Sequence, residues 1–201
     1  MQQKKRILLL ATGGTIASRK SDNGLKPQIT PEELIEYIPQ VKEICDVEAV
    51  QLLNLDSTNM EPSHWKLMVH AIWEHYDDFD GFVIAHGTDT LAYTASLLAL
   101  ALSKVEIPVF LVSSQLPLNQ EGANGNENFR RSVELICAGI HSGVYVVYRN
   151  EDGRCFLHHG GHLVSSGDYS NDFYSRDAVC LGEVSKVMEG ECSRAAMFCH
   201  A

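Results

Sequence analysis

The sequence predicts an α/β protein with a doubly wound, mostly parallel sheet flanked by helices. Three observations support this fold class. Apolar strand-like runs alternate with helical stretches five times between residues 7 and 149. The run at 81–85, GFVIA, is apolar throughout, which is typical of a strand covered on both faces. Alternating strands and helices require crossover connections, and these favour parallel strands.

Apolar runs and capping signals define the first elements. Ile7–Thr12 is the first predicted strand, and residues 47–54 are the second. Between them Thr30 is a good helix N-cap, because Pro31 stands at the first helical position and Glu33 completes a capping box. A helix beginning at Pro62 has apolar side chains at helical spacing, and its two tryptophans are predicted to pack: Trp65, Met68, Val69, Ile72 and Trp73.

The later elements repeat the same alternation. Helices are predicted at 89–103 and 126–140, and strands at 81–85, 108–113 and 143–149. A turn at 150–153 and a short strand at 154–158 follow. Beyond them the sequence is polar and irregular.

Composition excludes several function classes. The 201 residues suit one domain, or one domain with a fragment of another. A formal net charge of −10 argues against nucleic-acid and anionic-membrane partners. The apolar stretch Ile7–Ala11 is too short for a signal peptide, and no segment approaches the ~18 apolar residues of a membrane span. The six cysteines form no C-x-x-C pair, which favours reduced thiols in a cytoplasmic protein.

Ligands of doubly wound sheets bind beyond the carboxyl ends of the strands. Four predicted strands end in loops that carry hydroxyl groups, and these loops are expected to converge on one crevice. They are Gly13-Gly14-Thr15, DSTNM at 56–60, HGTDT at 86–90 and SSQLP at 113–117.

These loops suit a small zwitterion better than a nucleotide. Their glycines form neither nucleotide-binding pattern, and the loops hold no lysine or arginine for a phosphate. The Asp89 carboxylate can hold an ammonium group, while nearby hydroxyls and N–H groups hold a carboxylate. A threonine hydroxyl can also attack an acyl carbon when a base takes its proton. The hydroxyl groups are those of Thr15, Ser57, Thr58, Thr88, Ser113 and Ser114.

Simpler interpretations exist for each motif. Gly-Gly-Thr after a strand is also typical of an ordinary turn, and Thr88 and Asp89 are also typical helix N-caps. A histidine group with a nearby aspartate has a composition seen in metal sites, but its spacing favours loop histidines, and no metal is predicted. That group is His158, His159, His162 and Asp168.

Taken together, the loop motifs resemble the bacterial L-asparaginase family. The matching words are ATGGTIAS at 11–18, LDSTNM at 55–60, YDDFDGFVIAHGTDTLAYTAS at 76–96 and PVFLVSSQLP at 108–117. The resemblance covers roughly residues 5–150 and implies the larger, N-terminal domain of that family. It implies hydrolysis of L-asparagine to aspartate and ammonia without a cofactor, with L-glutamine as the other amide.

The resemblance also implies roles for individual residues. Thr15 matches the nucleophile, and Thr88 with Asp89 matches the second threonine and its acidic neighbour. Ser114 matches a position whose backbone carbonyl contacts the leaving amide. The implied substrate-binding residues are Ser57, Thr58, Asp89 and Ser114.

The resemblance further implies a lysine that partners Thr88 and Asp89. The sequence has no lysine between Lys104 and Lys186, and the aligned position falls near Val164. Our hypothesis for the missing base is His162, whose imidazole can accept a proton near neutral pH.

Family members carry a smaller second domain and complete their sites across a subunit interface. We therefore expect residues 1–185 to form the N-terminal domain and residues 186–201 a truncated linker toward an absent domain. The full-length protein is expected to be a cytoplasmic homo-oligomer. The competing interpretations are a catalytically silent amino-acid-binding domain and the amidase half of a larger amidotransferase.

Overall fold

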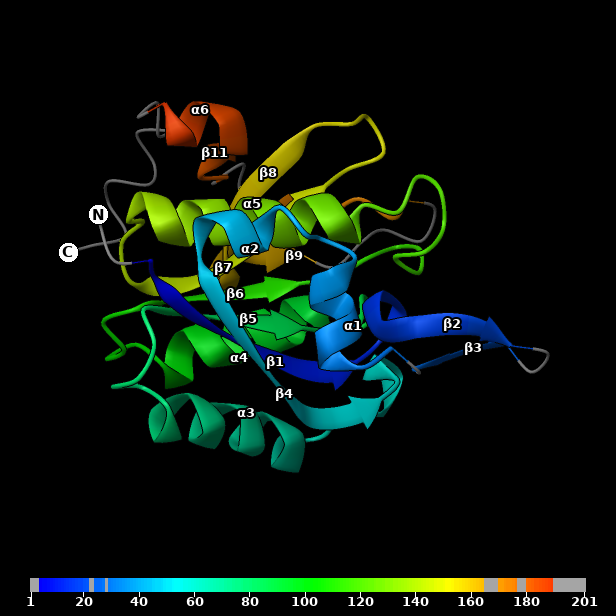
Figure 1. Ribbon diagram of the computed structural model, residues 1–201, viewed down its shortest axis with the longest axis horizontal. Coiled ribbons are helices and arrows are strands. Elements are labelled where there is room, and N and C mark those ends of the chain that lie inside the picture. The colour runs from blue at the N-terminus through cyan, green and yellow to red at the C-terminus, as the bar shows by residue number, and fades with distance from the viewer. Residues whose placement is uncertain (1–3, 22–23, 28, 165–169, 177–179, 190–201) are drawn as a thin grey trace.

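The computed structural model describes residues 4–21, 24–27, 29–164, 170–176 and 180–189. Its centre is a seven-stranded sheet with the order β11-β8-β7-β6-β5-β1-β4 (Figure 1). The strands from β7 to β4 in this order are parallel, whereas β8 and β11 run antiparallel to their neighbours. The predicted doubly wound, mostly parallel sheet is therefore confirmed. The strands are β1 (Arg6–Gly13), β4 (Asp46–Leu55), β5 (Gly81–Ala85), β6 (Pro108–Val112), β7 (Gly143–Arg149), β8 (Cys155–His159) and β11 (Gly182–Glu183).

Helices cover both faces of the sheet (Figure 1). Alternate residues of β1 point to opposite sides, so Ile7 and Leu9 enter one core while Leu8 and Leu10 enter the other. The first core is closed by α1 (Pro31–Glu36), α2 (Val41–Ile44), α5 (Gly125–Ala138) and α6 (Val184–Met188). The second core is closed by α3 (Pro62–Glu74) and α4 (Leu91–Ala101).

The chain changes direction across the sheet at β1. After β1 it adds β4 on one side, and it then crosses to add β5 on the other side. Leu9 accordingly pairs with Ala49 on β4 and with Val83 on β5. A ligand crevice is expected at such a switch point, at the carboxyl end of β1.

Local sequence signals set the helix ends. The capping box at α1 is present as predicted: Glu33 N donates to Thr30 Oγ1 at 3.2 Å, and Thr30 N donates to Glu33 Oε2 at 3.0 Å. The helix predicted at 126–140 stops at Ala138, because Gly139 adopts a left-handed conformation with φ of 85°.

Several elements lie outside the sequence prediction. A hairpin of β2 (Ser18–Ser21) and β3 (Gly24–Pro27) follows the first strand. Short β9 (Leu163–Val164) and β10 (Tyr174–Ser175) pair with each other beyond β8. The predicted division between residues 185 and 186 falls inside α6 and remains a prediction, since residues 190–201 lie outside the described residues.

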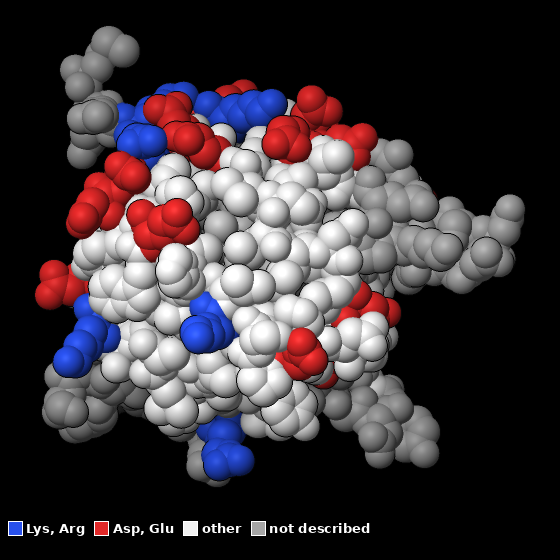
Figure 2. Space-filling view, turned by 90° about the horizontal axis from the view of Figure 1, so that it is seen from below, with Lys and Arg blue, Asp and Glu red and all other residues white. Residues whose placement is uncertain are grey.

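The side of the molecule on which α3 lies carries broad uncharged areas (Figure 2). Trp65 packs into the second core, as predicted. Trp73 differs from its prediction as a packed residue, because 46% of it is exposed; its ring lies 5.4 Å from that of Tyr76. Among the described residues, no helix has the length and apolar character needed to cross a membrane.

Removing the α1 cap should destabilise the protein. We expect Thr30→Ala to lower the free energy of unfolding by about 1 kcal/mol, because Glu33 N–H loses its acceptor. Thr30→Ser keeps an acceptor oxygen and should retain most of the stability. Urea denaturation of the three proteins measures the effect, and equal midpoints for Thr30→Ala and the parent would contradict it.

Candidate active site

Four neighbouring strands deliver the candidate residues to one edge of the sheet. The strands β6, β5, β1 and β4 are adjacent and parallel, so the loops at their carboxyl ends lie side by side. These loops carry the residues singled out by sequence: Ser114 after β6, Thr88 and Asp89 after β5, Thr15 after β1, and Ser57 and Thr58 after β4.

Glycines let three of these loops touch through their backbones. A Cβ at Gly14 would lie 2.4 Å from Gly87 N, and a Cβ at Gly87 would lie 2.3 Å from Ser57 Oγ. Gly14 also has φ of 77°, and its N–H donates to Leu55 O at 3.0 Å. No other residue fits at Gly14 or Gly87 without moving a neighbouring loop, which explains the Gly-Gly turn that precedes Thr15.

A side-chain hydrogen bond joins the loops after β4 and β5. Ser57 Oγ donates to Asp89 Oδ2 at 3.1 Å, and Thr90 Oγ1 donates to Ser57 O at 3.0 Å. Ser57 is only 2% exposed, whereas Asp89 is exposed. The buried hydroxyl thus fixes one oxygen of an exposed carboxylate, and such a carboxylate can bind a cationic group.

The threonines Thr15 and Thr88 follow the two glycines in contact. Thr15 begins the 3-10 helix η1 (Thr15–Ala17), which is anchored by the buried residues Ile16 and Ala17. Both Thr15 and Thr88 are partly exposed. Because Gly14 and Gly87 are in contact, the backbone segments that carry Thr15 and Thr88 start next to each other.

The N-cap interpretation of Thr88 and Asp89 is wrong. The N-cap of α4 is Thr90, which makes no side-chain cap hydrogen bond, and Asp89 instead accepts from Ser57. The helix therefore does not account for the carboxylate, which remains available to a ligand.

The structure turns Thr58 toward a different partner. Asp56 caps the 3-10 helix η2 (Ser57–Asn59), and its Oδ1 accepts from both Thr58 N at 3.0 Å and Thr58 Oγ1 at 2.9 Å. The exposed Thr58 hydroxyl thus bonds to Asp56 within its own loop, whereas the buried Ser57 hydroxyl bonds to Asp89 of the neighbouring loop.

The Ser114 hydroxyl is used inside the protein. It is buried, donates to Leu116 O and accepts from Gly125 N at 3.1 Å. The neighbouring Gln115 N donates to Asn124 Oδ1 at 3.0 Å, so side chain and backbone together fix the loop. This arrangement suits the implied role of Ser114, which uses its backbone carbonyl and not its hydroxyl.

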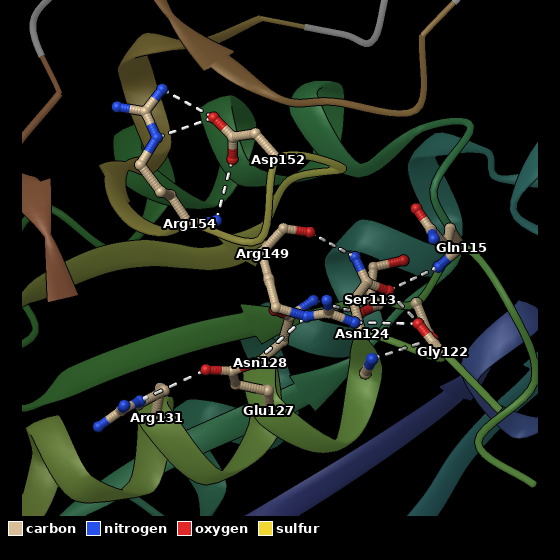
Figure 3. Close-up of polar contacts among 12 residues, drawn as sticks. Ser113, Gln115, Gly122, Asn124, Glu127, Asn128, Arg131, Arg149, Asp152 and Arg154 are labelled. Carbon is tan, nitrogen blue, oxygen red and sulfur yellow. Dashed lines mark hydrogen bonds and ion pairs between the residues drawn. The ribbon is translucent and has the colours of Figure 1, made fainter. Parts of the chain in front are cut away.

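Two asparagines that sequence reasoning missed connect this loop to α5 and β7 (Figure 3). Asn124 Nδ2 donates to Arg149 O at 2.8 Å, and Asn128 Nδ2 donates to Ser113 O at 2.9 Å. Asn128 Oδ1 also accepts from Arg149 N at 2.8 Å. Their spacing of four residues places both on one helix face, and this is the sequence pattern that could have identified them.

A buried histidine supports the Gly87 loop from below. His86 Nδ1 lies 2.7 Å from Gly87 O, and because a carbonyl only accepts, Nδ1 carries the proton. His86 Nε2 then accepts from Thr94 Oγ1 at 2.9 Å, and Thr94 Oγ1 accepts from Trp65 Nε1 at 2.8 Å. Burial lowers the pKa of His86 to about 4, so the ring is neutral near pH 7.

His162 lies beside α4, and the hypothesis that it is the base stays a prediction. It ends the 3-10 helix η3 (Gly160–His162), and Gly161 next to it approaches Ala99. Gly160 in the same 3-10 helix approaches Ala95 O, which is four residues beyond Leu91 at the start of α4, a distance of about 6 Å along a helix.

The histidines do not share one site. The His162 ring lies edge-on to that of His159, whereas His158 is buried with its Nδ1 2.8 Å from Ser175 Oγ. Asp168 lies outside the described residues, and within the described part of the chain no group of three or more His, Cys, Asp or Glu side chains could hold a metal.

Fold and site together define a doubly wound α/β protein with hydroxyls and a carboxylate at its topological switch point. The family model described as "Asparaginase, N-terminal" matches residues 6–191, and the chain belongs to the asparaginase family.

Two sequence relatives support this family membership. The chain is 36% identical over 147 residues to the L-asparaginase of Thermococcus kodakarensis, covering 73% of this chain and 44% of that protein. It is 37% identical over 161 residues to a glutamyl-tRNA(Gln) amidotransferase subunit of Methanococcus maripaludis strain C5, covering 78% of this chain and 38% of the relative.

Solved structures give the same result. The thermostable L-asparaginase from Thermococcus kodakarensis superposes with a TM-score of 0.74 at 32% identity, covering 89% of this chain and 53% of that structure. A probable cytoplasmic L-asparaginase from Campylobacter jejuni gives 0.75 at 31% identity, covering 90% and 54%. The chain spans about half the length of these structures, and less than half of the relatives above.

The network below the Gly87 loop should be sensitive to loss of one hydroxyl. Thr94→Val leaves the buried His86 Nε2 and the partly buried Trp65 N–H without this partner, so we expect the free energy of unfolding to fall by ~1–3 kcal/mol. Thr94→Ser keeps the hydroxyl and serves as the control. Urea denaturation followed by circular dichroism measures both, and a Thr94→Val protein as stable as the parent would refute the network.

Two buried histidines make stability dependent on pH. Burial lowers the pKa of His86 and of His158 to about 4, whereas a histidine of the unfolded chain titrates near 6.5. Between these values the unfolded state binds more protons, so stability is fully present above pH ~6.5 and is lost as the pH falls toward about 4. We expect His158→Asn to reduce this loss in urea titrations at successive pH values; an unchanged pH dependence would contradict this.

Proposed function

We propose that the chain is the amide-hydrolysing domain of an L-asparaginase-type amidohydrolase that converts L-asparagine to L-aspartate and ammonia. The Ser57–Asp89 hydrogen bond is the observation that supports this most directly, because it holds an exposed carboxylate next to Ser57, which packs against Gly87 where that residue contacts Gly14. Thr15 directly follows Gly14 and Thr88 directly follows Gly87, so two threonines adjoin the contact near this carboxylate.

In this proposal Asp89 binds the α-ammonium group of the substrate, and Ser57 holds the carboxylate in place. Ser57 and Thr58 contribute the β4-loop side of the pocket, and the Ser114 carbonyl contacts the leaving amide. The Thr15 hydroxyl oxygen attacks the side-chain amide carbon, the carbon–nitrogen bond breaks, and the nitrogen leaves as ammonia after taking the proton that the hydroxyl gives up. Water then hydrolyses the threonine ester and releases aspartate. No cofactor takes part in these steps.

Several parts of the fold would keep the site organised. The Gly87 carbonyl, which directly precedes Thr88, is held by His86, and the Ser114 loop is held by Asn124 and Asn128. Held groups need little rearrangement when charge develops on the substrate, which is where much of an enzyme's rate enhancement arises.

A second candidate function is binding of an acidic amino acid without turnover. The sequence has no lysine between Lys104 and Lys186 to serve as the base that the family resemblance implies. The carboxylate and hydroxyls would then hold a ligand without a base for Thr15. Similarity to a glutamyl-tRNA(Gln) amidotransferase subunit suggests a third candidate function, in which the domain releases ammonia from an amide as one part of an amidotransferase. We further propose that the complete protein is a cytoplasmic homo-oligomer.

Ammonia release distinguishes hydrolysis from binding. We expect the purified chain to release ammonia from L-asparagine, and Thr15→Val to lower the rate on the order of 10³-fold or more, because the nucleophile is removed. Thr15→Ser restores a hydroxyl and should restore part of the rate. L-glutamine, which is one methylene longer, should differ from L-asparagine by roughly 1–3 kcal/mol in transition-state stabilisation.

Calorimetry on the same proteins tests the alternative. Aspartate that binds the parent chain and not Asp89→Asn, with no ammonia from either amide, would support the silent binding domain and reject hydrolysis. Equal ammonia release by the parent and Thr15→Val would reject Thr15 as nucleophile.

A further inference from the structure

Two thiols meet where α2 packs on α5, on the face of the sheet opposite α3 and α4. Cys45 directly follows α2 and is 1% exposed, whereas Cys137 lies in the last turn of α5 and is partly exposed. The two thiols are close enough for each to shift the pKa of the other, and Cys45 Sγ lies 3.4 Å from Val41 O in the same turn. Cys137 Sγ also lies 4.0 Å from the carbonyl oxygen of Ile44, the residue before Cys45.

The surroundings make the two thiols unequal. The contact with Cys45 and the nearby Lys5 ammonium lower the pKa of Cys137 to about 7, against the opposing effects of burial, Asp80 and Glu134. Lys5 is held there because its Nζ donates to Ile136 O at 2.9 Å. For Cys45, the contact with Cys137 and burial raise the pKa, with a smaller raising effect of Asp46 and a lowering effect of Lys4.

We propose that Cys45 and Cys137 form an oxidisable dithiol that hydrogen peroxide converts to an intramolecular disulfide. Cys137 is the attacking residue, because its thiolate is the more populated and the more accessible. Because Cys137 is partly exposed, peroxide in solution can reach its sulfur. Cys45, which is buried in the protein interior, is the resolving residue.

The reaction balances in two steps. The Cys137 thiolate attacks one peroxide oxygen, the oxygen–oxygen bond breaks, and hydroxide leaves while Cys137 becomes a sulfenic acid. The Cys45 sulfur then attacks the Cys137 sulfur and the sulfenic oxygen leaves as water, taking the Cys45 proton. The two thiols lose two electrons, and the peroxide, with the protons released, becomes two molecules of water.

The disulfide would lie far from the candidate active site. Cys45 immediately precedes β4 and Cys137 closes α5, so both are at the amino ends of the parallel strands, whereas the candidate residues follow the carboxyl ends. The bond would close a loop of about ninety residues, and such long loops restrict the unfolded chain strongly. We therefore expect oxidation to raise thermal stability, whatever the outcome for the proposed hydrolysis.

Peptide mapping tests the proposal directly. The reduced 201-residue chain is treated with hydrogen peroxide, alkylated in denaturant and digested. We expect one cross-linked pair joining the Cys45 and Cys137 peptides, lighter than the two separate peptides by two hydrogens, and a melting temperature above that of the reduced chain. Both thiols recovered alkylated, or a cross-link of Cys137 to a different cysteine, would overturn the proposal.

Single variants separate the two roles. In Cys45→Ser the resolving thiol is gone but a hydroxyl donor remains beside Cys137, so Cys137 should accumulate as a sulfenic acid that dimedone traps, with no rise in melting temperature. In Cys137→Ser the buried Cys45 should stay reduced under the same treatment. Cross-linking or dimedone labelling at Cys45 in Cys137→Ser would show that Cys45 reacts with peroxide by itself, and would overturn the assignment of Cys137 as the attacking residue.

Cys155 supplies an internal control, because burial raises its pKa to about 12. At pH 7 iodoacetamide should modify Cys137 of the folded chain at least ~10-fold faster than Cys155, since the thiolate is the reactive form. Equal rates would show that Cys137 has no special reactivity.

Discussion

The contact between the backbones of Gly14 and Gly87 is the constraint on which the candidate site depends. The loops after β1 and β5 approach so closely there that a single added carbon would push them apart. The same approach brings Gly87 against Ser57, so the loop after β4 joins the first two. Because hydrophobic strands fix where each loop starts, the missing side chains at the glycines decide how near the functional groups come.

Polar contacts behind the loops keep this arrangement in place. On the α4 side, His86 and Thr94 hold the Gly87 carbonyl within a fully buried network. On the α5 side, Asn124 and Asn128 hold the Ser114 loop through hydrogen bonds to β7 and to the loop itself. The candidate site thus rests on both helical layers of the sandwich, and neither layer alone would fix all its loops.

Most of the sheet could be predicted because its central strands β1, β5, β6 and β7 are buried on both faces and alternate with helical segments. Residues 81–85 and 143–149 match β5 and β7 at both ends. The loop cluster could be predicted from topology, since parallel strands share one edge. The Trp65–Thr94–His86 chain could not, because its members come together only when α3 packs on α4. The position of His162 depended in the same way on how the chain returns over α4 after β8, which no local pattern encodes.

The hydrogen bond from Trp65 to Thr94 gives the protein a built-in optical reporter. The chain has two tryptophans, and they stand in contrasting environments: the Trp65 indole is part of the core network, whereas Trp73 is half exposed beside Tyr76. Their emission should therefore separate into a blue-shifted and a red-shifted component. The blue component belongs to the residue two hydrogen bonds away from His86, so changes in the loop that carries Thr88 and Asp89 have a direct route to fluorescence.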